Sequence, residues 1–229
     1  KYKATCWKSA IHDARRRKLR GQNHRNMPGE TPGRLGNPRK ERKMTSNVFS
    51  EFEIIEQHIK IAGNESFENM NCVGSSEEEL GVKTITKKCR GKVAKKRTRG
   101  TGDGTLKQSL HVPRSVYNEI YNMVRKELAK GVYAYGENSK HPEFSLTQKV
   151  LDEDGNIKFK AYPRCILSSG PSSKIENGAE EVAELEMTID LMPDENGECM
   201  YEALESELES EEIKQQWLTN FSLELVKAV

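Results

Sequence analysis

Apolar and polar residues alternate in several stretches of this chain, and such alternation predicts β-strands. The cleanest stretch is Val182–Leu191, in which the odd-numbered positions from 183 onward are all apolar. The even-numbered positions after residue 182 would form a polar face: Glu184, Glu186, Thr188 and Asp190. The pattern indicates a strand with one face in the core and the other outside it.

A β-hairpin is predicted where two alternating segments flank an acidic turn sequence. Phe144–Val150 would form the first arm, Ile157–Ala161 the second arm, and Asp152–Gly155 the turn between them. Val48–Ile61 mixes apolar and polar residues and is expected to supply the first strand or two. A last strand is expected at 217–225, where apolar residues alternate again.

Two segments have apolar residues at helical spacing. In the first, Ser115 would cap the N-terminus and Gly131 would close the C-terminus. Its apolar stripe consists of Val116, Tyr117, Ile120, Tyr121, Val124 and Leu128. The second, Met200–Ile213, has helical spacing on a very acidic background. Together the elements predict a mainly β protein of the α+β type, with two β-layers like a sandwich and one flanking helix.

A long basic excursion is predicted at 82–112, because both of its ends have strand-like sequences. Gly100–Gly104 would form the turn in the middle. Nine bases and no acid lie between residues 83 and 99: Lys83, Lys87, Lys88, Arg90, Lys92, Lys95, Lys96, Arg97 and Arg99. Arms of about ten residues would reach about 33 Å, at about 3.3 Å per residue. With so few apolar residues, such a hairpin is expected to become ordered only against a negatively charged partner.

The charge divides the chain at residue 44. Residues 1–43 hold 14 bases and 3 acids, a net charge of +11, whereas residues 44–229 hold 23 bases and 32 acids, a net charge of −9. The first segment lacks hydrophobic periodicity and is expected to be unstructured, which leaves 44–229 as the folded domain. One interpretation of 1–43 is a basic arm for nucleic acid. The favoured one is non-native upstream sequence before a start at Met44, because Glu41-Arg42-Lys43 is what a translated ribosome-binding site would encode.

Nothing in the residues indicates an enzyme, a metal or a cofactor. The chain lacks the motifs of serine hydrolases, zinc proteases, P-loop proteins and zinc deaminases. Its cysteines are scattered and odd in number, which favours free thiols over disulfides or a zinc site: Cys6, Cys72, Cys89, Cys165 and Cys199. The acidic clusters lack the spacing of a calcium-binding loop. No apolar run approaches the roughly 20 residues that a membrane-spanning helix needs.

Two kinds of partner fit the basic excursion. Nucleic acid would bind through phosphate contacts, although the absence of aromatic residues argues against stacking on single strands. The other partner is a neighbouring copy of the chain, because the rest of 44–229 holds 14 bases and 32 acids, a net charge of −18. A basic arm on an acidic body makes a head-to-tail contact, which builds rings or open filaments. Self-assembly is the favoured interpretation.

The chain also contains six longer motifs: Thr86–Gly91, Lys96–Gly102, Leu110–Pro113, Gly131–Gly136, Ala161–Pro163 and Lys174–Glu181. Together they resemble the major tail proteins, or tail tube proteins, of long-tailed bacteriophages. The resemblance covers essentially all of 44–229 and none of 1–43. It implies a β-sandwich with a flanking helix that forms homohexameric rings, and rings that stack into a hollow tube.

The resemblance also implies partners and a location. Besides copies of itself, the subunit would contact tape measure, terminator and baseplate proteins, and double-stranded DNA would pass through the tube without specific binding. It would be found in the virion tail, after assembly in the host cytoplasm, and needs no membrane or cofactor. A phage, a prophage and a tail-derived bacteriocin all remain open as its source.

Two sets of residues acquire expected roles from this resemblance. The excursion would be a hairpin that reaches the adjacent ring, through Lys87, Lys88, Arg90, Lys95, Lys96, Arg97 and Arg99. An acidic strand would line the bore through Glu184, Glu186 and Asp190, because like charge keeps passing DNA from sticking. The alternative for that strand is an ordinary solvent-facing side. Rival functions are another ring-forming tail component, such as a terminator or baseplate hub, and a basic-arm nucleic-acid-binding protein.

Overall fold

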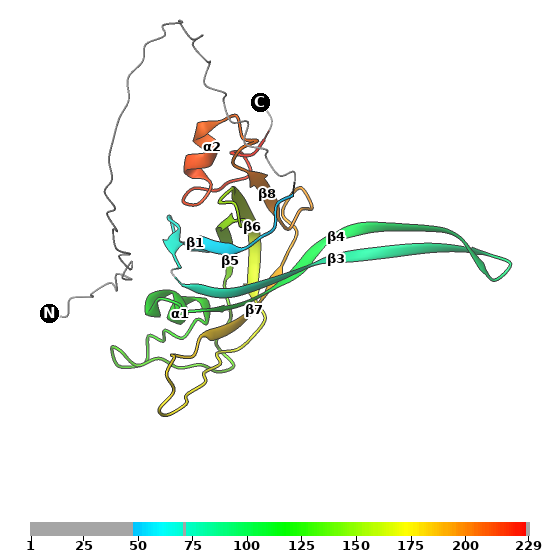
Figure 1. Ribbon diagram of the computed structural model, residues 1–229. Helices are drawn as coiled ribbons and strands as arrows, with labels where there is room; N and C mark the ends of the chain where they lie inside the picture. Colours follow the sequence, from blue (N-terminus) through cyan, green and yellow to red (C-terminus); the bar gives the residue numbers. More distant parts are fainter. Residues whose placement is uncertain (1–47, 71, 228–229) are drawn as a thin grey trace, which may run out of the picture. The chain divides into compact units, whose positions relative to one another are not determined.

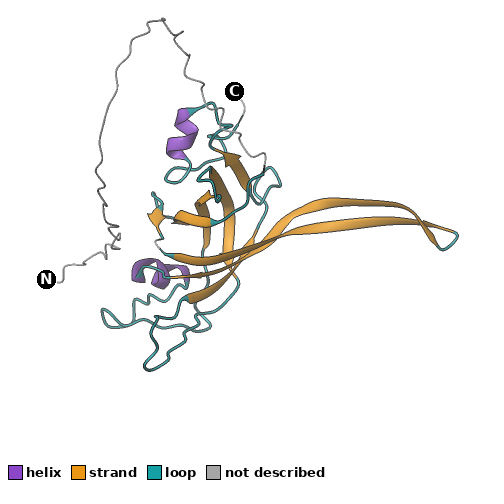
Figure 2. Ribbon diagram, viewed as in Figure 1, coloured by secondary structure: helices purple, strands orange, loops and turns teal. Residues whose placement is uncertain are grey.

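A computed structural model of the chain describes residues 48–70 and 72–227 (Figure 1). All of them belong to one compact unit, Ser46–Val229. The predictions for 1–43 and for a native start at Met44 lie outside the described residues. Antiparallel strands dominate the structure and helices are few (Figure 2), so the predicted mainly β class is confirmed.

The described strands form one antiparallel sheet in the order β2-β1-β5-β6-β7-β4-β3, and β8 pairs with β6 beside this path. Their bounds are β1 Glu53–Ile61, β2 Glu68–Asn69, β3 Val73–Cys89, β4 Lys92–Leu110, β5 Glu143–Leu151, β6 Ile157–Leu167, β7 Leu185–Leu191 and β8 Tyr201–Leu204. Two short helices accompany the sheet where one was expected: α1 Arg114–Ile120 and α2 Glu211–Gln216.

The sheet curls, so that strands far apart in its order approach each other. Gln57 on β1 and Gln108 on β4 exchange two side-chain hydrogen bonds of 3.2 and 2.9 Å. The two layers are therefore two halves of one sheet. The main core lies between them and beneath α1, and its fully buried members include Ile59, Leu106, Leu110, Val116, Ile120, Leu146, Tyr162, Ile189 and Leu191.

The β5–β6 hairpin forms where the sequence predicted it. The Oδ1 atom of Asp152 accepts hydrogen bonds from the backbone N–H groups of Asp154 (3.0 Å) and Asn156 (2.7 Å). Gly155 adopts a φ of 80°, a left-handed conformation that favours glycine. Turn chemistry and alternation agree at this position, and the prediction succeeds for that reason.

The first predicted helix is much shorter than expected. The helix α1 ends at Ile120, because Asn122 takes a left-handed φ of 47° and the N–H of Met123 donates to the carbonyl of Asn118. Asparagine tolerates this helix-ending conformation better than most residues. As a result, Val124 (59% exposed) and Leu128 (38% exposed) lie outside both helix and core. The predicted cap was also wrong, since the N-cap position is occupied by Pro113 and not Ser115.

The predictions for the C-terminal region were wrong as well. Residues 201–204 form β8 instead of a helix, because the free edge of β6 at Lys158–Ala161 pairs with them. Residues 217–227 form turns and no strand: Trp217 stacks on Phe159 at 5.9 Å between ring centroids, and Phe221 packs against Trp217. Trp217 and Phe221 therefore belong to a second small cluster over β6 and β8.

Candidate assembly surfaces

β3 and β4 continue far beyond the rest of the sheet and form a projecting hairpin (Figure 1). β4 pairs with β7 only from Gly104 to Leu110, so the outer parts of the two arms pair only with each other. This outer ladder runs from the pair Val82–Gly100 to the pair Cys89–Lys92. Every residue from 82 to 100 is exposed. The outer hairpin therefore has no core of its own within the described subunit.

The tip of the hairpin is at Arg90-Gly91, so the predicted turn at Gly100–Gly104 was wrong. Both tip residues are left-handed, with φ values of 50° and 75°, as the common two-residue hairpin turns require. The arms are 17 and 19 residues long, and the bases between residues 83 and 99, apart from Arg90 in the turn, are part of the strands. The glycine-rich stretch misled the prediction because it has more glycines than the true turn.

Gly100–Gly104 instead lies at the root of the hairpin, opposite Gly81. The register shifts there, since the pair Leu80–Gly104 is followed by Val82–Gly100. Gly102 has a φ of 78°, and a Cβ on it would lie 2.5 Å from the carbonyl oxygen of Gly197. These glycines therefore allow close backbone approach where the hairpin leaves the body.

All seven residues predicted for the assembly hairpin lie on its outer part and are exposed: Lys87, Lys88, Lys95, Lys96, Arg97 and Arg99 on the arms, and Arg90 in the turn. None of the nine bases from residue 83 to residue 99 forms an ion pair with a described residue. The positive charge of the hairpin is therefore not neutralised by ion pairs with the part of the subunit that the structure describes.

The polar face of β7 belongs to a wider acidic surface. Alternation is confirmed along the strand, where Met187, Ile189 and Leu191 are buried while Glu186 is exposed. Asp190 is half-buried and accepts a hydrogen bond of 2.9 Å from Ser168. The strand begins only at Leu185, so the predicted face is shorter than expected and exposed Glu184 precedes it.

The register extends this acidic surface across β4 to β3. Across the three strands, Glu186 on β7 lies opposite Ser109 on β4, which lies opposite Ser75 on β3. In the same way, Asp190 lies opposite Thr105, which lies opposite Glu79. Directly opposed residues project from the same face, so that face also includes Glu77 and Glu79. One base, Lys107, lies among them, 3.5 Å from Glu77. The sequence alone did not show this connection, because the glutamates at 77 and 79 are joined to the acidic face of β7 only through the register of β4.

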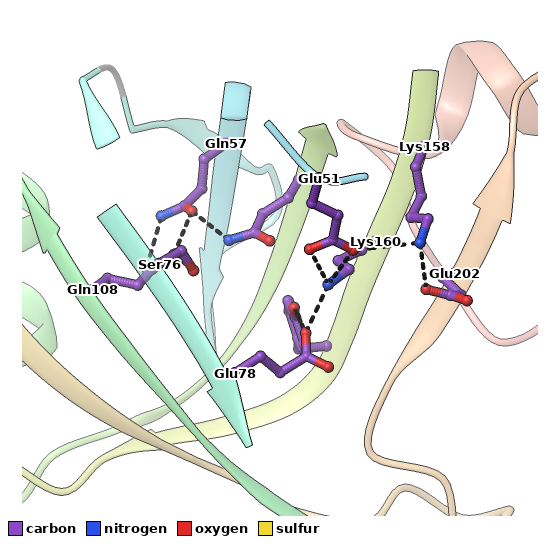
Figure 3. A network of polar contacts seen from close by, with 10 residues as sticks. Glu51, Gln57, Ser76, Glu78, Gln108, Lys158, Lys160 and Glu202 are labelled. Carbon is purple, nitrogen blue, oxygen red and sulfur yellow. Dashed lines mark hydrogen bonds and ion pairs between the residues drawn. The ribbon is translucent and has the colours of Figure 1, made fainter. Parts of the chain in front are cut away.

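The other face of β3 carries a buried ionic network (Figure 3). Lys160 on β6 lies 2.9 Å from both Glu51 and Glu78, and Tyr162 donates a 2.5 Å hydrogen bond to Glu78. Lys158 lies 3.3 Å from Glu51 and from Glu202. The network borders a cavity of about 350 Å³ between the N-terminal ends of β1 and β3.

The network shifts the pKa values of its members. Burial opposes the charged form of Glu51, but hydrogen bonds and charge from Lys160 and Lys158 outweigh it, so the pKa of Glu51 is lowered. Burial likewise opposes the charge of Lys160, yet its two carboxylate partners leave its pKa raised. Burial, reinforced by Glu78, raises the pKa of Tyr162. Glu51 and Lys160 are therefore held in their charged forms, whereas Tyr162 is held as a neutral hydroxyl that donates to Glu78. Together these contacts join β3, β6 and the segment before β1.

The described residues, 48–70 and 72–227, contain no group of three or more His, Cys, Asp or Glu side chains placed to hold a metal ion. Within the same residues, no helix has both the length and the apolar character needed to cross a membrane. Burial raises the pKa of the Cys165 thiol, and the nearby Cys199 adds to this effect. A thiol held in its protonated form is a poor nucleophile.

Comparison with known proteins gave limited similarity. No protein-family model matches the chain, and no curated protein does. Among solved structures, one similar chain is from the anti-feeding prophage cap, the AFP tube terminating cap, with a TM-score of 0.39, 10% identity, and coverage of 71% of this chain and 99% of that one. Another is from the AFP baseplate, with a TM-score of 0.39, 10% identity, and coverage of 70% and 97%. These values are low, so the function is argued from this chain's own residues and geometry.

Proposed function

We propose that this chain is a structural, non-enzymatic subunit of a bacteriophage tail tube, which polymerises as stacked homohexameric rings around a channel for DNA. The observation that carries the proposal is the outer part of the projecting hairpin, whose nine bases form no ion pair with a described residue of the same chain. The motif resemblance of residues 44–229 to major tail proteins supports the same function.

The hairpin is suited to joining one copy to the next. Its outer arms, from residue 82 to the tip at residue 90, would span about 30 Å at about 3.3 Å per residue. The rest of 44–229 has a net charge of −18, so the arm of one copy is attracted to the body of another. Contacts between different surfaces of identical copies are the ones that build rings and open-ended filaments.

The acidic face of β7, β4 and β3 is proposed to line the bore, with Glu186 and Asp190 on β7 and Glu184 next to it. Glu77 and Glu79 would extend this lining. An acidic wall repels the phosphates of passing DNA, whereas a basic wall would retain them. Along β3, the edge that faces away from β4 pairs with no described strand, so a neighbouring sheet can join there to close a barrel.

The test is negative-stain electron microscopy of the full chain at increasing concentration, together with size-exclusion chromatography. Hollow tubes of constant diameter are expected, and Arg97→Glu/Arg99→Glu should stop stacking while the subunit stays folded. Rings that never stack would instead indicate a terminator or baseplate hub. A small species that changes size only when DNA is added would replace the proposal with nucleic-acid binding.

Other expectations depend on this proposal. In a tail, the subunit would contact tape measure, terminator and baseplate proteins, and its final location would be the virion tail after assembly in the host cytoplasm. Density for this chain between the capsid and the baseplate of purified particles would support this placement.

A further inference from the structure

The outer hairpin has two chemically different faces. Residues directly opposite each other in an antiparallel ladder project from the same face, and successive pairs alternate between faces. One face, named the cationic face here, contains the pairs Lys83–Arg99, Ile85–Arg97 and Lys87–Lys95. The opposite face, named the threonine face, contains the pairs Val82–Gly100, Thr84–Thr98 and Thr86–Lys96. Five of the six residues on the first face are bases, against one of the six on the second.

The cationic face is unfavourable for an isolated hairpin. Lys83 opposes Arg99 and Lys87 opposes Lys95, and like charges directly opposite each other destabilise a strand pair. The threonine face has no such conflict, since the Oγ1 atoms of Thr84 and Thr98 are 3.1 Å apart and share a hydrogen bond. The threonine face thus stabilises the ladder by itself, whereas the repulsion between like charges on the cationic face has to be offset by negative charges from a partner.

The cationic face also carries apolar surface for a partner to cover. Ile85 lies at the centre of this face and is 56% exposed. The methylene stems of the surrounding lysines and arginines can pack against a protein surface while their charged ends pair with carboxylates. A protein partner can therefore contact both the apolar surface and the charged ends of this face, whereas a phosphate backbone would contact mainly the charged ends.

We propose that the cationic face alone docks on an acidic surface of a second copy of this chain, while the threonine face stays in solvent. The inference rests on the proposed function and assigns its inter-ring contact to one side of the hairpin. Charge complementarity identifies the occupant, because the rest of 44–229 has a net charge of −18. Duplex DNA, whose major groove admits a two-stranded ribbon, is the rival that the experiment must separate.

Two variants with the same change of net charge test the assignment. Arg97→Gln/Arg99→Gln removes two positive charges from the cationic face. Val82→Glu/Thr86→Glu adds two negative charges to the threonine face, where residue 82 opposes Gly100 and residue 86 opposes Lys96, and it leaves the hydrogen bond between Thr84 and Thr98 in place. All four positions are exposed, so neither variant disturbs a core. A second cationic-face variant, Lys83→Gln/Lys95→Gln, tests whether the effect belongs to the whole face and not only to positions 97 and 99.

The measurement is the critical concentration for assembly of the full chain, freed of nucleic acid, by sedimentation and electron microscopy. Each cationic-face variant should raise the critical concentration at least about tenfold, or about 1.4 kcal/mol. The threonine-face variant should stay within about twofold of wild type. Circular dichroism should show all variants folded.

Several results would overturn the assignment without touching the tail tube function. Equal effects of the two charge-matched variants would show that net charge, not a face, controls assembly. Normal assembly of the cationic-face variants would show that this face does not contact a second copy. If the same variants also bound duplex DNA more weakly than wild type, the cationic face would be a nucleic-acid-binding surface instead. If wild type itself forms neither rings nor tubes, the proposed function fails and the inference fails with it.

Discussion

Replacement of Lys160 by methionine tests whether the buried ionic network holds the subunit together. The side chain of Lys160 is 8% exposed, and those of its partners Glu51 and Glu78 are 43% and 18% exposed. Methionine has a similar length and no charge, so the substitution removes the ion without opening a large cavity. Two carboxylates would then face each other with no base between them.

The magnitude follows from the exposure of each partner. Removal of one member of a buried ion pair costs about 3–5 kcal/mol, because the other charge stays buried without compensation. Glu51 is half exposed and keeps Lys158 at 3.3 Å, so most of the cost comes from Glu78. We therefore expect Lys160→Met to lower the free energy of unfolding by about 3 kcal/mol, at the low end of that range.

Lys158→Met is the matched control, because it removes the same residue type from the same strand. Its partners Glu51 and Glu202 are 43% and 49% exposed, so its loss should cost about 1 kcal/mol. Adding Glu78→Gln to Lys160→Met should restore part of the loss, since it removes the uncompensated carboxylate.

Urea unfolding followed by tryptophan fluorescence measures these differences at a concentration below that of assembly. Trp217 is a suitable probe because its indole Nε1 donates a 3.1 Å hydrogen bond to the backbone carbonyl of Lys160. The reasoning is refuted if Lys160→Met unfolds at the wild-type urea midpoint, or if Lys158→Met costs as much as Lys160→Met.

Three further predictions concern the fold. Trp217→Ala should lower the free energy of unfolding by about 3–5 kcal/mol, because it empties a buried site over β6; calorimetry would contradict this if the melting temperature were unchanged. Gly102→Ala should lower the free energy of unfolding in urea by more than about 1 kcal/mol, because residue 102 has a left-handed φ and a Cβ there would collide with the carbonyl of Gly197. Gly63→Ala is the control: its φ is 100°, but the space around it is open, so it should cost less in the same measurement. The lowered pKa of Glu51 adds stability above the ordinary value of 4.5, which is lost as pH falls through the folded value. Glu51→Gln should therefore flatten the pH dependence of the urea midpoint below about pH 5. An unchanged slope would show that Glu51 does not cause the pH dependence of stability.

The sequence predicts the fold well where local turn chemistry and alternation agree. The β5–β6 hairpin has both, with Asp152 and Gly155 in the turn, and β7 has an unbroken alternation from Leu185 to Leu191. In these elements, every local preference favours the native structure.

The failures have different causes, but in each of them another feature of the chain outweighed the helical spacing of apolar residues. Residues 201–204 pair as a strand with the edge of β6 at Lys158–Ala161, although the apolar residues of this segment have helical spacing. Asn122 ended α1 although apolar residues continued at helical spacing to Leu128. Neither the free strand edge nor the competing turn is visible in a count of apolar positions.

The candidate site was predictable in composition but not in geometry. The nine bases of the hairpin are evident from the sequence, whereas their division into two faces depends on the register from Lys83–Arg99 to Lys87–Lys95. The same holds for the acidic face, because Glu77 and Glu186 become neighbours of β4 only through strand pairing. Register is fixed by the turn, and the turn was the feature predicted incorrectly.

The position of that turn strengthens the case for an acidic partner. A turn at Gly100–Gly104 would have placed all nine bases of 83–99 on one arm, so that they would not have opposed one another across the ladder. The turn at Arg90-Gly91 instead fixes Lys83 opposite Arg99 and Lys87 opposite Lys95, at directly opposed positions of a regular ladder. Natural sequences break such a local pairing rule mainly at functional sites, where a gain elsewhere compensates for the cost. Since none of the bases from residue 83 to residue 99 pairs with an acid among residues 48–70 and 72–227, that gain has to come from outside the described residues, and the acidic body of a second copy is the partner proposed above.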